Sequence, residues 1–536
     1  MQTDLGLVDY GPTPTDEDMA RIADVCVVGS GASGSIVAAT LAEAGLDVVV
    51  LEQGPFVSPD MSYDDLEDLS ERAWVRKADG VWAKIGYPWS SCNVGGGTVF
   101  YGGISFRHRY PDFNAEELLG GGEWPLEWPW KPHELEPFYN SVERRLGVSG
   151  GPGDPTLPPG HSYPLPPLAQ TPSGRAIADG ARSLGLHPFP TPMAINSLPY
   201  GGRPACSRDN DCVAARCEKG AKGDSFSVFL KSLVERGTVR LFAGMKAARI
   251  TAASASQATG VECVQVNTGK RFLFRAKQIV VACNAIQSAA LLLRSADTHS
   301  PHGLGNQFGL VGRGLCMKAN EYVVAYRRSD RIELPLAGVG PNGGVGPCST
   351  VAIADYYTAD DAPGGIGGMI FESAEDAHPL RGDEQTLRID CIAPDEPRKS
   401  NRVLLAKKHD RFGLPEVALE YAPSARDQAR REYLLQRGED ILRAAGGKYL
   451  RRERSLGELG STHLHGTCRS GIDEATSVTD PDGRLHTVDN VSVVDGALMP
   501  YPGAVNPTLT IQALALRQAH RLLERGFSMS RMVGSA

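Results

Sequence analysis

A glycine-rich turn near the N-terminus constrains the fold of this chain more than any other feature of its sequence. The apolar run Val25–Val28 leads into GSGASG at residues 29–34, and an alanine-rich segment over 35–44 follows and ends before Gly45. A buried strand, a tight glycine turn and a helix in this order form the phosphate-binding start of a dinucleotide-binding unit. The sequence therefore predicts an α/β protein with a Rossmann-like domain near its N-terminus.

The residues of this turn and the next apolar run have separate roles. The run Val48–Leu51 ends at Glu52, whose carboxylate is placed to accept hydrogen bonds from a ribose. Gly29 permits the tight bend, Gly31 lets a pyrophosphate approach the backbone, and Gly34 allows close packing of helix on strand. The helix N-terminus stabilises the phosphate charge. The cofactor contacts predicted for this segment are Gly29, Gly31, Ala32, Ser33, Gly34 and Glu52.

A second glycine cluster, CNVGGGTVFYGG, occupies residues 92–103. Its backbone amides can pass close to a second part of a large cofactor, and a nicotinamide enzyme rarely needs this second cradle. Taken alone, the stretch is also compatible with a glycine-rich surface loop. The cofactor contacts predicted here are Gly96, Gly97, Thr98, Tyr101 and Gly102.

Length and charge exclude several classes of protein. The chain has 536 residues, which is enough for two or more packed lobes, since single cores stop growing at about 250–300 residues. Its net charge is −8, and no basic run could neutralise a phosphate backbone, so we expect no nucleic-acid partner. No apolar run approaches the ~20 residues of a membrane span, and the acidic first residues lack the layout of a signal peptide. We expect a cytoplasmic protein without a membrane partner.

Two histidines lie one residue apart in THLHGTC, residues 462–468. On a strand, His463 and His465 would point to the same face, because side chains alternate. That arrangement suits a metal, but no carboxylate or cysteine stands beside the pair at a familiar ligand spacing. Metal is therefore the minor interpretation, no metal site is assigned, and satisfied core histidines are the alternative.

The C-terminal region predicts a strand followed by a helix. The run VSVVDGALMP at 491–500 reads as a buried strand ending at Asp495-Gly496. After it, Leu509 and its neighbours recur at helical spacing up to a predicted stop at Gly526. Asn506 fits the N-cap of this helix, and Pro507 fits its first position. The positive end of the helix is thus available to an anionic group.

These segments, in this order, resemble the glucose–methanol–choline (GMC) family of FAD-dependent alcohol oxidoreductases. The resemblance implies FAD as the cofactor and His463 as the base that takes the hydroxyl proton while hydride leaves the same carbon for the flavin. Asn506, 43 positions later, would hold the alcohol oxygen by a hydrogen bond. His465 is more compatible with packing behind the site, and Cys468 with the core. Further FAD contacts implied by the resemblance are Ala247, Asp495, Gly496, Asn506, Pro507 and Thr508.

The same resemblance implies two discontinuous domains. An FAD-binding domain would comprise residues 20–110, 205–320 and 458–530. A substrate-binding domain, built on a mostly antiparallel sheet, would comprise 111–204 and 321–457 and include a lid or linker. Alternating apolar runs at Thr350–Ala354 and Arg388–Ile392 are typical of such a sheet.

Longer segments are similar to the paromamine 6'-oxidase branch of the family. They include YPWSSCNVGGGTVFYGGISFRHR, the stretch RPACSRDNDCVAARCEKGAKGD, and VVACNAIQSAALLLRS with GLVGRGLCMK. The likeness implies oxidation of the 6'-hydroxymethyl group of a cationic aminosugar to an aldehyde. Oxygen or another acceptor would take the electrons, and a pyridoxal-phosphate aminotransferase would then use the aldehyde. Oxidation of a ring hydroxyl of a pyranose or glycoside, and a lyase with a structural flavin, are the alternatives.

Several features stay open at this level. The cysteines of Cys206-x5-Cys212-x4-Cys217 are read as loop or buried thiols rather than a metal site, since a fourth ligand is missing. Arg107-His108-Arg109 is predicted to lie on a solvated face. The proline- and glycine-rich stretch Gly150–Pro167 reads as a linker or lid. The sequence does not choose among four carboxylates considered for binding an ammonium group, which are Asp154, Asp224, Glu372 and Asp390.

Overall fold

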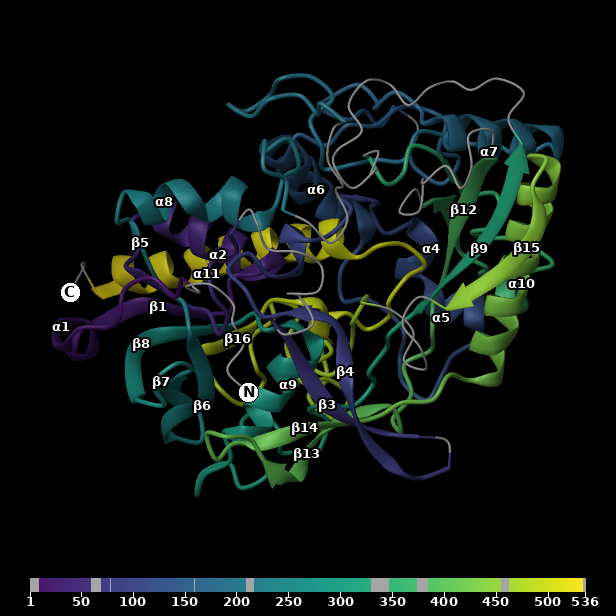
Figure 1. Cartoon of the computed structure of the whole chain (residues 1–536). Coiled ribbons are helices and arrows are strands. Elements are labelled where there is room, and N and C mark those ends of the chain that lie inside the picture. Colours follow the sequence, from purple (N-terminus) through teal and green to yellow (C-terminus); the bar gives the residue numbers. More distant parts are fainter. Residues whose placement is uncertain are drawn as a thin grey trace.

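The computed structural model describes residues 9–58, 69–77, 79–158, 160–208, 216–328, 347–373, 384–454 and 462–533. Its strands form sheets of seven, five and four strands. In Figure 1 the seven-stranded sheet lies on the left with helix α11 (Thr508–Val533), and the five-stranded sheet lies on the right with α10 (Ala425–Ala444). Within these described ranges, no helix has the length and apolar character to cross a membrane.

The seven-stranded sheet is built around the predicted dinucleotide-binding segment. Its order is β5-β2-β1-β8-β7-β6, and β16 pairs with β8. The first four strands of this order and β16 are parallel, whereas β6 and β7 pair antiparallel. These strands are β1 (Ile22–Val28), β2 (Val48–Leu51), β5 (Val239–Phe242), β6 (Met245–Ser254), β7 (Gln257–Gln265), β8 (Arg271–Val281) and β16 (Val491–Val493).

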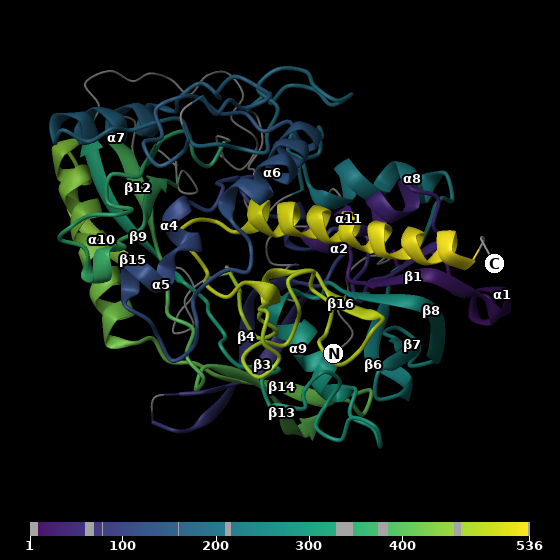
Figure 2. The same cartoon turned by 180° about the vertical axis from the view of Figure 1, so that it is seen from behind.

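Two helices cover the strands of the glycine turn. The helix α2 (Ala32–Glu43) follows the turn and ends before Gly45, whose φ of +89° is the left-handed conformation that glycine adopts after a helix. Buried side chains of α2, such as Ile36, pack in one core with Leu509 of α11. Figure 2, seen from behind, shows α11 lying along α2. The predicted stop of α11 at Gly526 is wrong, because one interior glycine costs a helix only about 1 kcal/mol.

The five-stranded sheet confirms the predicted antiparallel architecture. Its order is β10-β11-β12-β9-β15, and every neighbouring pair is antiparallel. Alternate residues such as Val323 and Ile389 pack against α10 and α7 (Pro172–Ser183), which leaves the opposite face for Phe371 and Ile392. The strands are β9 (Ala319–Arg328), β10 (Ala352–Ile353), β11 (Met369–Glu372), β12 (Glu384–Ala393) and β15 (Lys448–Arg454).

A four-stranded sheet joins segments that lie far apart in the sequence. Its order is β13-β14-β3-β4, with the parallel pair Ala418↔Trp74 at its centre. It therefore combines strands from the predicted FAD-binding segments with strands from the predicted substrate-binding segments. The strands are β3 (Ser70–Arg76), β4 (Trp82–Ser91), β13 (Arg402–His409) and β14 (Pro415–Glu420). The remaining α-helices are α1 (Asp16–Ala20), α4 (Tyr110–Phe113), α5 (Ala115–Leu119), α6 (Pro132–Leu146), α8 (Lys231–Glu235) and α9 (Asn284–Arg294).

Candidate active site

The two predicted glycine cradles meet. Gly95 donates its backbone N–H to the hydroxyl of Ser30 at 3.1 Å, and a Cβ built on Gly96 would lie only 2.8 Å from the Cα of Gly31. Gly96 also has a φ of +58°, so this close approach requires glycine. A Cβ on Gly31 would have only the Cα of Gly96 within 4 Å, at 3.8 Å. The backbone therefore leaves open a cradle that a side chain would fill, and this fits the pyrophosphate of a dinucleotide.

The remaining predicted residues of the second cradle anchor it to the chain that follows Ala221. Thr98 accepts a hydrogen bond from the backbone N–H of Ser225 at 2.9 Å. Tyr101 donates its hydroxyl to the carbonyl of Gly223 at 2.6 Å. Gly97 lies in the short helix Gly96–Val99, and Gly102 follows Tyr101. The cluster is thus not the glycine-rich surface loop that the sequence left as an alternative.

Glu52 lies at the end of β2 and is tied to the first cradle. One carboxylate oxygen accepts the backbone N–H and the hydroxyl of Ser30 at 3.0 and 2.7 Å, and the other accepts the N–H of Gly54 at 2.9 Å. Burial raises the pKa of this carboxyl, and these hydrogen bonds oppose the shift. Ala247 is close by, because Met245 at the start of its strand donates to the carbonyl of Glu52.

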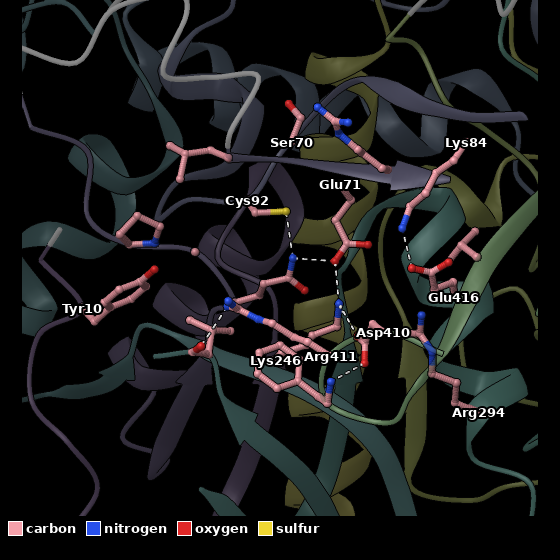
Figure 3. Close-up of a pocket in the computed structure, with 18 residues that line it drawn as sticks. Tyr10, Ser70, Glu71, Lys84, Cys92, Lys246, Arg294, Asp410, Arg411 and Glu416 are labelled. Carbon is pink, nitrogen blue, oxygen red and sulfur yellow. Dashed lines mark hydrogen bonds and ion pairs between the residues drawn. The ribbon is translucent and has the colours of Figure 1, made fainter. Parts of the chain in front are cut away.

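A cavity of about 280 Å³ adjoins this end of the sheet. Its wall includes Gln53 and Gly54, which follow Glu52, and Lys246, which precedes Ala247. Figure 3 shows a chain of polar contacts across it, in which Glu71 accepts from Gln53 at 2.7 Å and pairs with Lys246 at 3.0 Å. The cavity therefore adjoins two residues expected to contact the cofactor.

Asp495 links the C-terminal segment to helix α9. Its carboxylate accepts the hydroxyl of Ser288 at 2.5 Å and the N–H of Ala497 at 2.8 Å. Burial raises its pKa to about 6. A Cβ on Gly496 would lie 2.5 Å from the carbonyl oxygen of Leu464, so Gly496 permits the segment to pass directly beside the histidine strand.

His463 and Asn506 come together, as the sequence predicted for the catalytic pair. Nδ2 of Asn506 lies 3.2 Å from Nε2 of His463, and both side chains are part-buried. An amide nitrogen can only donate, so with the amide in this orientation Nε2 of His463 is the acceptor. Loss of solvation, and then the positive charge of Lys318, hold the pKa of His463 well below its ordinary value.

Asn506 is not the predicted helix cap. The first helical hydrogen bond runs from Ile511 N–H to the carbonyl of Pro507, which makes Pro507 the N-cap and Thr508 the first helical residue. Among the described residues, Oδ1 of Asn506 has no hydrogen-bond partner. The helix starts one residue later than predicted, and the Asn506 amide is turned toward His463 instead.

His465 and Cys468 are held inside the protein. His465 exchanges backbone hydrogen bonds with Cys316 at 3.0 and 3.1 Å, and its Nδ1 lies 2.7 Å from the carbonyl oxygen of His463. It is fully buried, and its ring lies 6.5 Å from that of His108. Cys468 is buried in the core, which confirms the prediction for that residue. Across the described ranges, no three His, Cys, Asp or Glu side chains are grouped to hold a metal.

The predicted solvated face of Arg107-His108-Arg109 is wrong, because all three side chains are buried. The guanidinium of Arg107 pairs with both oxygens of Glu143 at 2.7 Å, and that of Arg109 pairs with Asp154 at 2.6 Å. These charge-assisted hydrogen bonds offset the cost of removing the guanidiniums from water. Such partners lie too far along the chain to be recognised from a basic triplet.

The segment Ala504–Asn506 is held by residues that the sequence analysis missed. The N–H of Ala504 donates to the hydroxyl of Tyr357 at 3.0 Å, and that hydroxyl donates to Asp112 at 2.6 Å. The carbonyl of Val505 accepts a hydrogen bond from Nζ of Lys318, a lysine only 1% exposed. The sequence offered one signal for Lys318, which is that a lysine ends the otherwise apolar run GLCMK. A lysine next to such a run is a candidate for burial with a partner.

All four carboxylates considered for substrate binding have partners within the protein. Asp154 pairs with Arg109, Asp224 accepts the N–H of Ser227, and Glu372 accepts the hydroxyls of three residues, Thr171, Ser173 and Thr350. Asp390 accepts a hydrogen bond from Asn320 at 3.2 Å, and it lies on the face of β12 that carries Ile392, which packs with Val505. Of the four, Asp390 is therefore the one that faces the Ala504–Asn506 turn.

Two other predictions fall on loops. Cys206 and Cys217 are half-buried, and Cys212 lies outside the described residues. In the stretch Gly150–Pro167, a Cβ on Gly150 would lie 2.3 Å from the ring of Tyr163, so the start of this stretch is closely packed.

Comparison with protein-family models gives three matches. Residues 165–319 and 397–515 each match a model described as GMC oxidoreductase, and residues 27–77 match an NAD(P)-binding Rossmann-like domain. The last match covers the end of β1, the glycine turn and Glu52 of the first cradle.

Curated relatives and solved structures agree with these matches. The chain is 46% identical to 6'''-hydroxyparomomycin C oxidase of Streptomyces lividus, over 94% of this chain and 91% of the relative. It is 45% identical to paromamine 6'-oxidase of Streptomyces fradiae, over 95% and 93%. The crystal structure of pyridoxine 4-oxidase from Mesorbium loti shares the fold, with a TM-score of 0.65, 20% identity and coverage of 93% and 99%. The chain belongs to the GMC oxidoreductase family of FAD-dependent enzymes.

Proposed function

We propose that this chain is an FAD-dependent oxidase of an aminoglycoside, which converts a 6'-hydroxymethyl group of a paromamine-type compound to the aldehyde. The observation that carries the proposal is the likeness to the two Streptomyces oxidases, which extends over more than nine-tenths of the chain. Both of those enzymes are named for oxidation of an aminoglycoside. The pairing of His463 with Asn506 supplies the groups that oxidation of an alcohol needs.

His463 would accept the proton of the substrate hydroxyl. Its Nε2 is an acceptor in the structure, so it can receive the proton of a substrate hydroxyl placed between His463 and Asn506. The amide of Asn506 would then donate to the substrate oxygen and hold it as negative charge develops there. Because a base must be neutral to act, the depressed pKa of His463 keeps it competent at neutral pH.

The cofactor would be held by the two cradles and by the Asp495–Thr508 segment. FAD, when bound, supplies the acceptor for the hydride that leaves the alcohol carbon. Backbone amides of Gly31 to Ser33 at the start of α2 would bind its pyrophosphate, and Glu52 would bind its ribose. The start of α11, at Pro507 and Thr508, would present its positive end to the isoalloxazine. We also propose that residues 20–110, 205–320 and 458–530 form the FAD-binding domain, and that 111–204 and 321–457 form the substrate-binding domain. The positions of the predicted cofactor contacts in the first set support this division.

Asp390 is proposed to bind an ammonium group of the substrate. It is 5% exposed, it accepts a hydrogen bond from Asn320 at 3.2 Å, and its face of the sheet is directed at the turn that carries Asn506. A carboxylate in this position would recognise the charge that distinguishes an aminosugar from a neutral sugar.

Replacing Asp390 with asparagine raises KM for paromamine by about 10- to 150-fold, because a hydrogen bond to a charged group contributes about 1.5–3 kcal/mol, and changes kcat little. Steady-state kinetics with paromamine and with an uncharged alcohol measure the effect. The uncharged substrate should show no such rise. Asp440→Asn, on the exposed side of α10, is the matched control. An unchanged KM for paromamine in Asp390→Asn contradicts the assignment.

Anaerobic mixing with paromamine tests the function as a whole. We expect the flavin absorbance to bleach and the product to have lost two hydrogens, with the new aldehyde trapped and located by mass spectrometry. A panel of aminoglycosides, glucose and simple alcohols distinguishes the alternatives. Turnover of a ring hydroxyl without a 6'-aldehyde would favour a pyranose or glycoside oxidase, and product without bleaching would favour a lyase.

The proposal also covers the steps that follow oxidation of the substrate. An aldehyde on an aminosugar is a substrate for a pyridoxal-phosphate aminotransferase, which would convert it to an amine in the cytoplasm. Oxygen or another acceptor would reoxidise the flavin. Purified enzyme with paromamine, with and without an added aminotransferase, tests this coupling by the mass of the final product.

A further inference from the structure

We propose that Lys318 is a positioning residue for the reaction: its hydrogen bond to Val505 places Asn506, and its positive charge holds the His463 imidazole in the neutral form. The inference rests on the proposed role of His463 as the base. Lys318 is not among the cofactor-binding or catalytic residues that the sequence predicted.

Strand pairing brings Lys318 to His463. Cys316 and His465 exchange two backbone hydrogen bonds as an antiparallel pair. This bridge is isolated, and Lys318 and His463 each lie two residues from it along their segments. The two segments therefore pass side by side here, and the positive charge of Lys318 acts on the imidazole of His463.

The backbone of Lys318 is fixed in an unusual conformation. Its φ is +56°, which is uncommon for a residue with a Cβ. Asp395 holds this turn, since its carboxylate accepts the N–H of Met317 at 2.8 Å and that of Lys318 at 3.0 Å. Tyr421 donates its hydroxyl to the same carboxylate at 2.8 Å. The polar cluster gives the side chain a defined direction, toward the Val505 carbonyl.

The hydrogen bond to Val505 acts on the residue next to it. Ala504 is held through its N–H by Tyr357, and Val505 through its carbonyl by Lys318. A Cβ on Gly503 would lie 2.9 Å from Asp112, so the turn is also packed against a carboxylate. Asn506 is the next residue in the chain, so these contacts fix the peptide that carries its side chain. The amide of that side chain lies 3.2 Å from Nε2 of His463. Loss of the lysine contact would release the peptide that carries Asn506.

The charge of Lys318 acts in the pH range where a histidine would otherwise take up a proton. Burial lowers the pKa of Lys318 to about 7, while Asp112 and Asp395 act to raise it. Below that pH the amine is an ammonium, and it opposes a second positive charge on His463. The other titratable or charged groups around the pair are Arg109, His108, His465, Cys316, Tyr357 and Tyr421.

The protonation of His463 can be measured without turnover. The holoenzyme is labelled with ¹³C at the histidine Cε1 atoms, and the signal of His463 among the 12 histidines is identified by its loss in His463→Gln. In the wild type we expect the His463 midpoint to lie well below the usual value of about 6.5. In Lys318→Gln, which keeps a donor but removes the charge, we expect it to rise by about one to two units. The acid limb of flavin reduction should move by the same amount.

Lys318→Arg is the conservative variant, and it should keep the wild-type midpoint because it keeps the charge. An unchanged midpoint in Lys318→Gln overturns the proposal. A wild-type midpoint at or above the usual value of about 6.5 also overturns the proposal, because the Lys318 charge would then not depress it. Failure of the proposed function is separate, since it would appear as normal flavin reduction in His463→Gln whatever the titration shows.

Discussion

Replacing His463 with alanine lowers the rate of flavin reduction by roughly 10²–10⁴-fold, the usual contribution of a positioned general base, while FAD stays bound. The imidazole contributes the acceptor Nε2 beside Asn506, and alanine leaves the hydroxyl proton without an acceptor. The predicted cofactor cradles are built by other segments, so the yellow colour of the protein should persist. Stopped-flow absorbance under anaerobic conditions, with paromamine as reductant, measures the rate.

The neighbouring histidine provides the matched control. His465→Ala should affect reduction much less, because His465 holds its Nδ1 at the carbonyl of His463 and is fully buried. Its main effect should be on thermal stability, since it leaves a cavity in the protein. If His465→Ala slowed reduction more than His463→Ala, the base would be His465 and the assignment of His463 would be wrong.

Gly31→Ala weakens FAD binding by about 10- to 100-fold without unfolding the chain. The new methyl group meets only Gly96, at an ordinary contact distance, and the φ of Gly31 is −72°, which alanine adopts readily. The methyl group instead occupies the cradle where the pyrophosphate would lie, and overpacking of this kind costs about 1–3 kcal/mol. The flavin content of purified protein and titration of the apoprotein with FAD measure the loss.

Gly122→Ala is the control for this prediction. Gly122 lies exposed in a loop, and a Cβ there would meet its nearest neighbour at 3.5 Å. It should bind FAD as the wild type does, and the far-ultraviolet circular dichroism of both variants should match the wild type. Full flavin occupancy in Gly31→Ala would show that the cofactor does not approach this backbone.

Local sequence patterns predicted the first cradle because every element in it is short-range. Strands β1 and β2 follow from compact apolar runs, and the turn between β1 and α2 from glycine spacing. The approach of Gly96 to Gly31 was not predictable from either cluster alone, since it depends on how two distant loops pack. Resemblance to a family supplied the pairing of His463 with Asn506.

Two failures of the sequence analysis share one physical cause, which is that burial depends on partners elsewhere in the chain. Arg107 and Arg109 read as solvated because Glu143 and Asp154 are remote in sequence. Lys318 was passed over because its partners, Asp395 and Val505, become neighbours only in the folded protein. The end of α11 was placed too early for a different reason: Gly526 was treated as a stop, although one interior glycine costs a helix only about 1 kcal/mol.

The position of β16 in the large sheet has a consequence for synthesis on the ribosome. Residues 491–493 pair with β8, and the segment that follows them carries Asn506 and begins α11, which packs on α2. A nascent chain that has emerged only as far as β15 thus lacks a strand, the helix over α2 and both members of the catalytic pair. Such long-range pairing forms slowly and late. Flavin capture should therefore follow release of the chain, and partly translated chains should remain colourless.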